Sequence, residues 1–214
     1  MPPRRKRRKY DSTGRKASAD RTRHAILDAA HRLFVSRGYE ATSMAGIAAE
    51  AGVATDTVYA AAGRKPALMR LLLERAISGG DDPVPAGERD YVRAIQAEKA
   101  PARKLAIYAA AIRTIHGRLA PLVRSVQGAA SVHPEVARAW KEISERRARN
   151  MRLFVAHLAA TGALRASLDP NEAADVVWAT NSPELYLLLV GERGWTPERY
   201  EAWLARVWER LLLP

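Results

Sequence analysis

Helical spacing of apolar residues limits the fold of this chain more than any other feature of its sequence. From residue 89 onward, apolar side chains recur every three or four positions, and no segment alternates apolar and polar residues as a half-buried strand does. The spacing predicts helices near 89–98, 102–117, 119–130, 134–161, 171–190 and 197–213, with breaks at Pro101, Pro121, His133-Pro134, Thr161-Gly162, Asp169-Pro170 and Gly194. This pattern predicts an all-α fold.

The first eighty residues carry shorter helical patterns that are separated by glycines. We expect helices over 19–37, 43–51, 55–60 and roughly 66–78, each followed by a glycine or a turn-forming residue. The stretch 79–88 (GGDDPVPAGE) is rich in glycine, proline and acidic residues, and it is the clearest linker in the chain.

Residues 43–60 (SMAGIAAEAGVATDTVYA) have the spacing of a helix-turn-helix, with Gly52 between two short helices. Small apolar residues would hold these helices at a steep angle and leave Thr55, Asp56 and Thr57 on a free face, which in this motif enters a major groove. Hydroxyls can read base edges or phosphates, whereas Asp56 would accept from a cytosine amino group or orient a neighbouring side chain. Ordinary packing of short alanine-rich helices is the alternative interpretation.

Positive charge is concentrated at the N-terminus. The chain carries 35 Lys and Arg against 23 Asp and Glu, and residues 1–23 hold ten of the basic residues but only two acidic ones. Residues 1–17 have almost no apolar side chains, and we expect them to form a disordered basic arm whose natural partner is polyphosphate. The hexamer RRKRRK at 4–9 would contact phosphates or a minor groove; a solubility tail or a localisation signal is the alternative.

Absent features exclude several classes of protein. The chain has no cysteine, which excludes disulfides and thiolate metal sites and favours a reducing cytoplasm. No apolar run reaches the ~18 residues of a membrane span, and no apolar signal-peptide segment follows the basic N-terminus. Residues 89–214 hold no nucleotide fingerprint, phosphate loop or catalytic-triad spacing, and the five histidines are scattered. We therefore expect a cytoplasmic protein that is not an enzyme, with no cofactor, no metal and no membrane partner.

Residues 23–68 resemble the DNA-binding domain of TetR-type transcriptional regulators. The match keeps its register over about a fifth of the chain; its anchors are Ile26-Leu27, Ala29-Ala30, Leu33-Phe34, Gly38-Tyr39, Thr42-Ser43, Ile47-Ala48, Ala51-Gly52-Val53, Val58-Tyr59, Lys65 and Leu68. The resemblance implies an N-terminal three-helix helix-turn-helix domain, followed by a C-terminal helical domain for ligand binding and dimerisation. We place the basic arm at 1–17, the DNA-binding domain at 18–66 and the C-terminal domain at 67–214.

The resemblance also implies roles for single residues. Thr42 corresponds to the family's capping residue at the second helix, which also meets a phosphate, while Tyr59 and Lys65 would grip the DNA backbone. The residues implied to contact DNA are Arg23, Thr42, Ser43, Thr55, Asp56, Thr57, Tyr59 and Lys65. The chain departs from the family at Ala62, usually an aromatic, which predicts a looser turn. It departs also at Ala54, often a serine, so that Thr55 would cap the third helix.

The last two predicted helices carry more apolar surface than a single chain is expected to cover. Helix 197–213 has a wide apolar stripe that includes Trp208, and helix 172–190 is apolar nearly all round. Such a helix must be covered on every side, and a twofold-related copy would cover it. The TetR resemblance implies a four-helix bundle made from these two helices of each subunit, with Trp208 in its seam. Burial within one chain is the alternative.

A small-molecule site is predicted between helices of the C-terminal domain. Aromatic side chains, a methionine and a few polar groups suit a partly apolar ligand, although each is more often a core residue. The candidate lining residues are Tyr108, Ile112, His116, Trp140, Met151, Phe154, Trp178 and Asn181.

These expectations describe a homodimeric repressor that binds a double-stranded DNA operator and is released by a small, partly apolar ligand. Two alternatives remain open. One is a sequence-tolerant DNA-binding protein in which the basic arm dominates and no ligand acts; the salt dependence of binding and the specificity ratio would distinguish it. The other is a helical enzyme with a DNA-binding appendage, which the scattered titratable groups disfavour.

Overall fold

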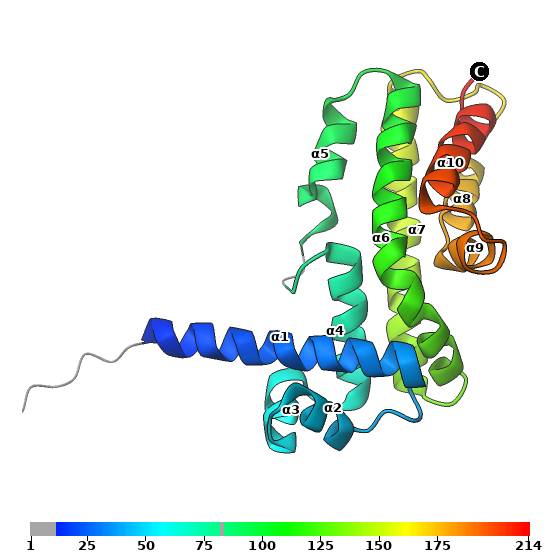
Figure 1. Cartoon of the computed structure of the whole chain (residues 1–214). Helices are drawn as coiled ribbons and strands as arrows, with labels where there is room; N and C mark the ends of the chain where they lie inside the picture. Colours follow the sequence, from blue (N-terminus) through cyan, green and yellow to red (C-terminus); the bar gives the residue numbers. More distant parts are fainter. Residues whose placement is uncertain (1–11, 82–83) are drawn as a thin grey trace, which may run out of the picture.

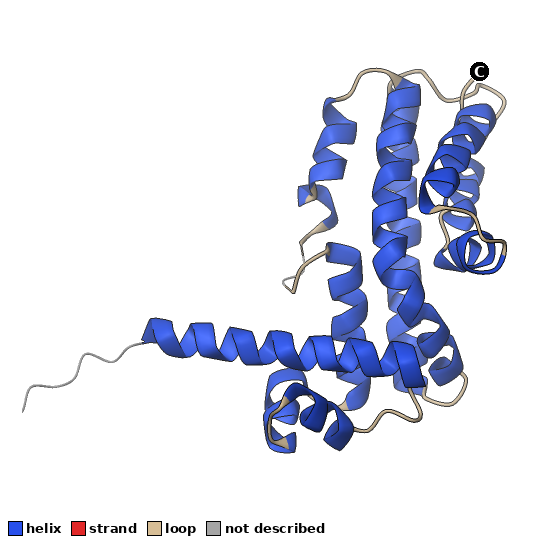
Figure 2. Cartoon of the chain, viewed as in Figure 1, coloured by secondary structure: helices blue, strands red, loops and turns tan. Residues whose placement is uncertain are grey.

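The chain folds into helices that are joined by short turns. The computed structural model describes residues 12–81 and 84–214, and within those ranges it contains no strand (Figure 2). The helices are α1 (Ser12–Arg37), α2 (Met44–Ala51), α3 (Thr55–Ala62), α4 (Lys65–Ser78), α5 (Asp90–Ala97), α6 (Pro101–Ala130), α7 (Pro134–Ala160), α8 (Pro170–Thr180), α9 (Pro183–Tyr186) and α10 (Pro197–Leu212). The predicted all-α class is confirmed (Figure 1). Within the described ranges, no helix has both the length and the apolar character needed to cross a bilayer.

The first helix begins earlier than the sequence pattern indicated. α1 starts at Ser12, so the expectation of a disordered arm is wrong for residues 12–17, while residues 1–11 lie outside the described part of the chain. The side chains of residues 16–21 are exposed, and α1 projects past α2 and α3 (Figure 1). The helix continues there without packing because each added residue gains a hydrogen bond and does not repeat the cost of nucleation, and Arg, Lys and Ala are good helix formers.

α1, α2 and α3 form the three-helix unit predicted for the N-terminal region. Ile47 and Val58 are fully buried between these helices. Gly52 follows α2 with a φ of 68°, a left-handed conformation that favours glycine, and its N–H bonds back to the Ala48 and Ala49 carbonyls. The predicted glycine turn between two short helices is therefore confirmed.

The long helices α6 and α7 lie side by side and connect two hydrophobic cores (Figure 1). The first core combines α1 to α4 with the C-terminal part of α6, including Leu122 and Val126, and the start of α7. The second core combines the remainder of α6 and α7 with α5, α8 and α10. The sequence predicted a domain boundary between residues 66 and 67. Because α4 belongs to the first core, tight packing continues across these residues, and the boundary stays a prediction.

Pro121 does not break the helix that contains it. The sequence predicted two helices separated at this proline, but α6 runs from Pro101 to Ala130 without interruption. The apolar face continues on both sides, with Leu119 and Leu122 buried, so tertiary packing holds both halves in one helix. Gly117 lies four residues before Pro121, where the proline ring crowds the backbone carbonyl, and glycine gives that backbone freedom to adjust.

The segment predicted as one helix over 171–190 is instead broken at Asn181 and Ser182. α8 ends at Thr180; the Ser182 hydroxyl then accepts a hydrogen bond from the Leu185 N–H at 3.1 Å and caps α9, which passes into a π-helical turn at Leu187–Glu192. The cause is Pro183, which lacks an N–H and disfavours a helical conformation for the residue before it.

α10 divides its apolar residues between the chain's own core and an outer face. Trp208 is fully buried, stacks on Tyr108 with ring centroids 5.2 Å apart, and donates from Nε1 to the Thr180 hydroxyl at 2.8 Å. The prediction that Trp208 lies in a seam between subunits is therefore wrong, because α6 covers this side of α10 within one chain. Other apolar residues of α10, among them Leu211, remain open on the outer face.

Candidate functional site

Thr42 and Ser43, which precede α2, use their hydroxyl groups for different hydrogen bonds. The Ser43 hydroxyl accepts a hydrogen bond from the Gly46 N–H at 3.0 Å and thereby caps α2. Thr42 is only 2% exposed, and its hydroxyl donates to the Gly38 carbonyl at 2.8 Å. The expectation that Thr42 caps α2 is therefore wrong, because the Ser43 hydroxyl has that role. A contact between the buried Thr42 and a phosphate stays a prediction. Ser43 is exposed and is the hydroxyl available at the surface.

α3 has the open face that a recognition helix needs. Val58 and Ala62 are buried against the core, whereas Asp56 is exposed and the Tyr59 ring is 46% exposed. Of the three predicted base-reading residues, Asp56 is exposed, whereas Thr55 and Thr57 are half-buried, and Thr55 lies on the same side of α3 as Val58. Their contacts with DNA stay a prediction.

The start of α3 differs from expectation at Ala54, where the chain departs from the TetR pattern. Ala54 is the N-cap residue and makes no side-chain hydrogen bond, and Thr55 is already the first helical residue, so Thr55 does not replace the missing cap. After Ala62, α3 ends with a hydrogen bond from the Gly63 N–H to the Tyr59 carbonyl at 2.9 Å, and a looser turn at this position stays a prediction.

Lys65 is held in place at the start of α4. Its Nζ lies 4.2 Å from the centroid of the Tyr39 ring and donates to the Glu40 carbonyl at 3.5 Å. Partial burial lowers the pKa of the Lys65 ammonium below its ordinary value. A positioned ammonium at this edge suits the predicted point contact to a DNA phosphate. Arg23, the remaining candidate, is half-buried on α1.

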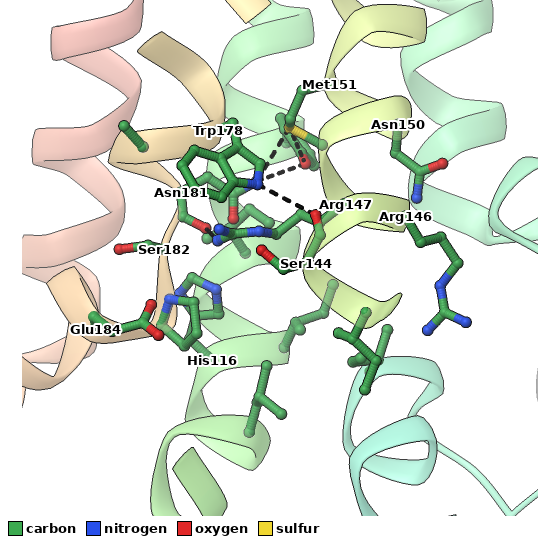
Figure 3. Close-up of a pocket in the computed structure, with 18 of the residues that line it drawn as sticks. His116, Ser144, Arg146, Arg147, Asn150, Met151, Trp178, Asn181, Ser182 and Glu184 are labelled. Atoms are coloured by element: carbon green, nitrogen blue, oxygen red, sulfur yellow. Dashed lines mark hydrogen bonds between the residues drawn. The ribbon is translucent and has the colours of Figure 1, made fainter. Parts of the chain in front are cut away.

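A cavity of about 400 Å³ lies between α4, α6, α7 and α8 (Figure 3). This volume lies within the range of pockets that hold small organic ligands. Seven of the eight predicted ligand residues line it: Tyr108, Ile112, His116, Trp140, Met151, Trp178 and Asn181. The eighth, Phe154, lines an adjoining hollow of about 280 Å³ beneath α5, which shares Tyr108 and Met151 with the cavity, and its ring centroid lies 4.7 Å from that of Tyr108. The structure therefore brings the predicted set together, with Phe154 outside the cavity itself, and ligand binding by these residues stays a prediction.

Asn181 joins three elements at one wall of the cavity. It is only 1% exposed, and its Nδ2 donates to the Tyr108 hydroxyl at 2.8 Å and to the Met151 sulfur at 3.3 Å. The Tyr108 hydroxyl in turn donates to the same sulfur at 3.1 Å. The Asn181 Oδ1 is buried and has no partner among the described residues. A polar group in this state is costly and is usually satisfied by a ligand or a bound water.

Arg147 is a cavity residue that the sequence analysis missed. Its guanidinium lies 4.8 Å from the centroid of the Trp178 ring, and its Nη1 donates to the Asn181 carbonyl at 2.5 Å (Figure 3). Burial lowers the pKa of this guanidinium, and only partial compensation comes from Glu184. The signal was present in the sequence, because Arg147 lies four residues after Ile143 and four before Met151, on the apolar face of α7.

His116 is buried beside Arg147 and remains neutral. Burial first, and the charge of Arg147 second, hold the pKa of its imidazole at about 3. Its Nδ1 is buried without a hydrogen-bond partner among the described residues. The Tyr186 ring lies edge-on to it, with centroids 5.6 Å apart. His116 therefore presents a neutral, unsatisfied polar edge within an otherwise aromatic wall.

The cavity contacts the helix that leads to the DNA-binding unit. Ile77, near the C-terminal end of α4, lines the cavity. Arg146, another lining residue on α7, donates from one nitrogen to both carboxylate oxygens of Glu74 on α4, at 2.9 and 2.8 Å. A change in the cavity can therefore reach α4 through an apolar contact and through an ion pair.

Comparison of the chain with family models gives a match in the N-terminal region. Residues 26–72 match the model described as bacterial regulatory proteins, tetR family. This range covers α2 and α3 together with most of α1 and the first part of α4. No curated protein sequence gives a significant match to the chain.

Solved structures share the fold along nearly the whole chain. NalD, the secondary repressor of the MexAB-OprM multidrug efflux pump in Pseudomonas aeruginosa, has 20% identity and a TM-score of 0.71, covering 92% of this chain and 98% of NalD. A putative transcriptional regulator from Saccharomonospora viridis in complex with choline has 17% identity and a TM-score of 0.68, covering 91% and 99%. The SmeT–triclosan complex has 19% identity and a TM-score of 0.64, covering 90% and 92%. At these identities the likeness shows the fold.

Proposed function

We propose that this protein is a TetR-type repressor, and not an enzyme, that is released from its operator by a small, partly apolar ligand. Support comes from the match of residues 26–72 to the tetR family model and from the fold shared with solved TetR-family transcriptional regulators. The protein acts in the cytoplasm as a homodimer, and the α3 helix of each subunit enters the major groove of one half-site. Two of the similar structures are complexes with small molecules, which supports a ligand-responsive protein.

The main support for this proposal is that α4 connects the DNA-binding helices to the cavity. Only Gly63 and Arg64 separate α4 from α3, and Leu68 and Leu72 of α4 lie in the same core as the DNA-binding helices. The far end of α4 lines the cavity through Ile77. A ligand can release DNA only if it favours an arrangement of α4 that does not fit the operator, because equal affinity for both arrangements shifts nothing. A coupling free energy of about 1–3 kcal/mol would change operator affinity about 5–150-fold.

Selection from a pool of random DNA with the purified protein tests the DNA-binding part of the proposal. We expect a roughly palindromic sequence whose half-sites lie about 34–36 Å apart, or a multiple of that spacing. Its affinity should exceed that for scrambled DNA at least about 1,000-fold at physiological salt. A pool without an enriched sequence would contradict the proposal and would favour sequence-tolerant binding.

The basic arm is tested separately by deletion of residues 1–11, which leaves α1 intact. We expect weaker binding to every DNA sequence and a shallower slope of log affinity against log salt, by about 0.9 for each lost phosphate contact. A matched variant in which the six basic residues at 4–9 are glutamines keeps the length and should behave like the deletion. An unchanged slope in both variants would show that the segment is not a DNA contact.

A further inference from the structure

The guanidinium of Arg147 is a half-buried cation at the cavity without a carboxylate partner. Within the described residues it forms no ion pair, and its one hydrogen bond goes to the Asn181 carbonyl. Its remaining N–H donors have no protein acceptor in that part of the chain. Removing a charge from water is costly unless the charge is paired and hydrogen-bonded, so a bound anion would relieve this cost.

The other charged groups of the cavity do not neutralise Arg147. The charged lining residues are Arg89, Arg146, Arg147 and Glu184. Arg146 already pairs with Glu74 on α4. Glu184 accepts a hydrogen bond from Gln127 at 3.3 Å and lies beyond ion-pair distance of Arg147. His116 is neutral, so the cavity retains an excess of positive charge, which attracts anions and repels cations.

The remaining wall fits an apolar body with one polar end. Ile112, Trp140 and Ile143 supply apolar surface, while the unpartnered His116 Nδ1 and Asn181 Oδ1 are buried at the same cavity. Rotating the Asn181 amide by 180° would let Tyr108 donate to Oδ1 and would turn Nδ2 into a free donor. A cationic ligand is disfavoured, because Arg147 already lies over the Trp178 ring that would otherwise receive it.

We propose, on the basis of the function proposed above, that the effector is a compact apolar monocarboxylate whose carboxylate pairs with the Arg147 guanidinium. The pairing is charge-assisted and can be bidentate, which fixes the orientation of the ligand. Its apolar body lies against Trp140 and Ile112. The effector thereby pairs with a half-buried charge that has no carboxylate partner among the described residues.

Head-group series measured on the wild-type protein test the ligand class directly. The probes carry a carboxylate, a carboxamide or an ammonium on the same apolar frame, using phenyl, naphthyl and cyclohexyl frames, and binding is measured by calorimetry without DNA. On the frame that binds most tightly, the carboxylate should bind at least about tenfold more tightly than the carboxamide, and the ammonium should bind most weakly. Equal or tighter binding of the carboxamide or the ammonium would overturn the proposal, as would the absence of carboxylate binding on all three frames.

Variants of Arg147 assign the preference to this residue. Arg147→Met keeps the apolar stem, and it should reduce the advantage of carboxylate over carboxamide to about twofold or less, while Arg147→Lys retains part of it. Arg149→Met is the matched control, because Arg149 is exposed on the same helix and should leave all affinities unchanged. A full carboxylate preference in Arg147→Met would also overturn the proposal. Circular dichroism checks that each variant folds. If Arg147→Met does not fold, the head-group series on the wild-type protein still tests whether the site prefers a carboxylate.

Operator release by the same probes is measured separately, by fluorescence anisotropy of labelled DNA. Carboxylate binding without release would contradict the ligand-responsive function and leave the inference about Arg147 standing. Release by a carboxamide that acts equally on wild type and Arg147→Met would support that function and overturn the inference.

Discussion

The buried imidazole of His116 links the stability of this protein to pH. Its pKa is about 3 in the folded chain, against an ordinary value of 6.5. Between these two values the unfolded chain binds a proton that the folded chain does not bind, so stability is lost as the pH falls below 6.5 and is unaffected by this residue above it. The contribution amounts to about 1.4 kcal/mol of unfolding free energy for each pH unit in this window.

Denaturant unfolding at several pH values between about 7 and 4 measures this contribution. In His116→Gln, the free energy of unfolding should fall less steeply with decreasing pH than in the wild type. The difference in slope should correspond to the uptake of about one proton on unfolding. Parallel slopes in the wild type and His116→Gln would mean that the imidazole does not stay neutral in the folded state.

Variants of α3 and of the first residue of α4 should separate the reading of bases from contacts with the DNA backbone. We expect Thr55→Ala and Thr57→Ala to change the preferred base at the position read, by about 1–3 kcal/mol. Tyr59→Phe and Lys65→Ala should instead weaken binding to good and poor operators by similar factors. Binding-site selection with each variant provides the measurement. An unchanged motif for both threonine variants would remove them from the reading face.

At the scale of the helices, most elements could be predicted from the sequence, because apolar spacing and glycine stops are local signals. The errors arose where a local signal competed with packing. Pro121 has the sequence signature of a break, yet buried apolar residues on both sides keep α6 continuous. Pro183 does end a helix, but the unbroken apolar pattern around it hid the break. For residues 12–17, low hydrophobicity indicated disorder, although an existing helix can be extended by exposed residues.

Pro121 should therefore reduce the stability of α6. It lies on the exposed side of the helix and cannot donate to the carbonyl four residues earlier. Pro121→Ala should raise the free energy of unfolding by up to about 3 kcal/mol, measured by denaturant unfolding. Gly128→Ala serves for comparison, because open space surrounds this exposed glycine, and it should add only about 1 kcal/mol. A loss of stability in Pro121→Ala would show that the packing around α6 requires the proline.

At the scale of the whole molecule, the sequence could predict which residues line the cavity better than it could predict the charge within it. Large aromatic and aliphatic residues gather between helices, so seven predicted residues meet there, while Phe154 points to the hollow beneath α5. Arg147 was missed because a charged residue on a helix is ordinarily solvated. Only the three-dimensional arrangement shows that Asn181, from the turn after α8, accepts its hydrogen bond.

The outer face of α10 supports the proposed dimer. Leu211 is 46% exposed, and Val207 and Trp203, one and two turns earlier on the same face, are half-buried. A double variant, Val207→Glu with Leu211→Glu, should sediment as a folded monomer at micromolar concentration and lose high-affinity operator binding. Leu153→Glu, at a 70% exposed position on α7, is the control and should remain dimeric. A wild-type protein that sediments as a monomer would contradict the dimer directly.

The uninterrupted length of α6 has a mechanical consequence. Thirty residues at 1.5 Å each make a rod of roughly 45 Å, with one end in each hydrophobic core. A tilt of only about 5° at the cavity end would carry the other end by roughly 4 Å, which exceeds the rise of about 3.4 Å between successive base pairs. In the proposed dimer, two such rods, one in each subunit, would add their displacements. A ligand that tilts α6 at the cavity would thereby shift both α3 helices relative to the base pairs of the proposed operator.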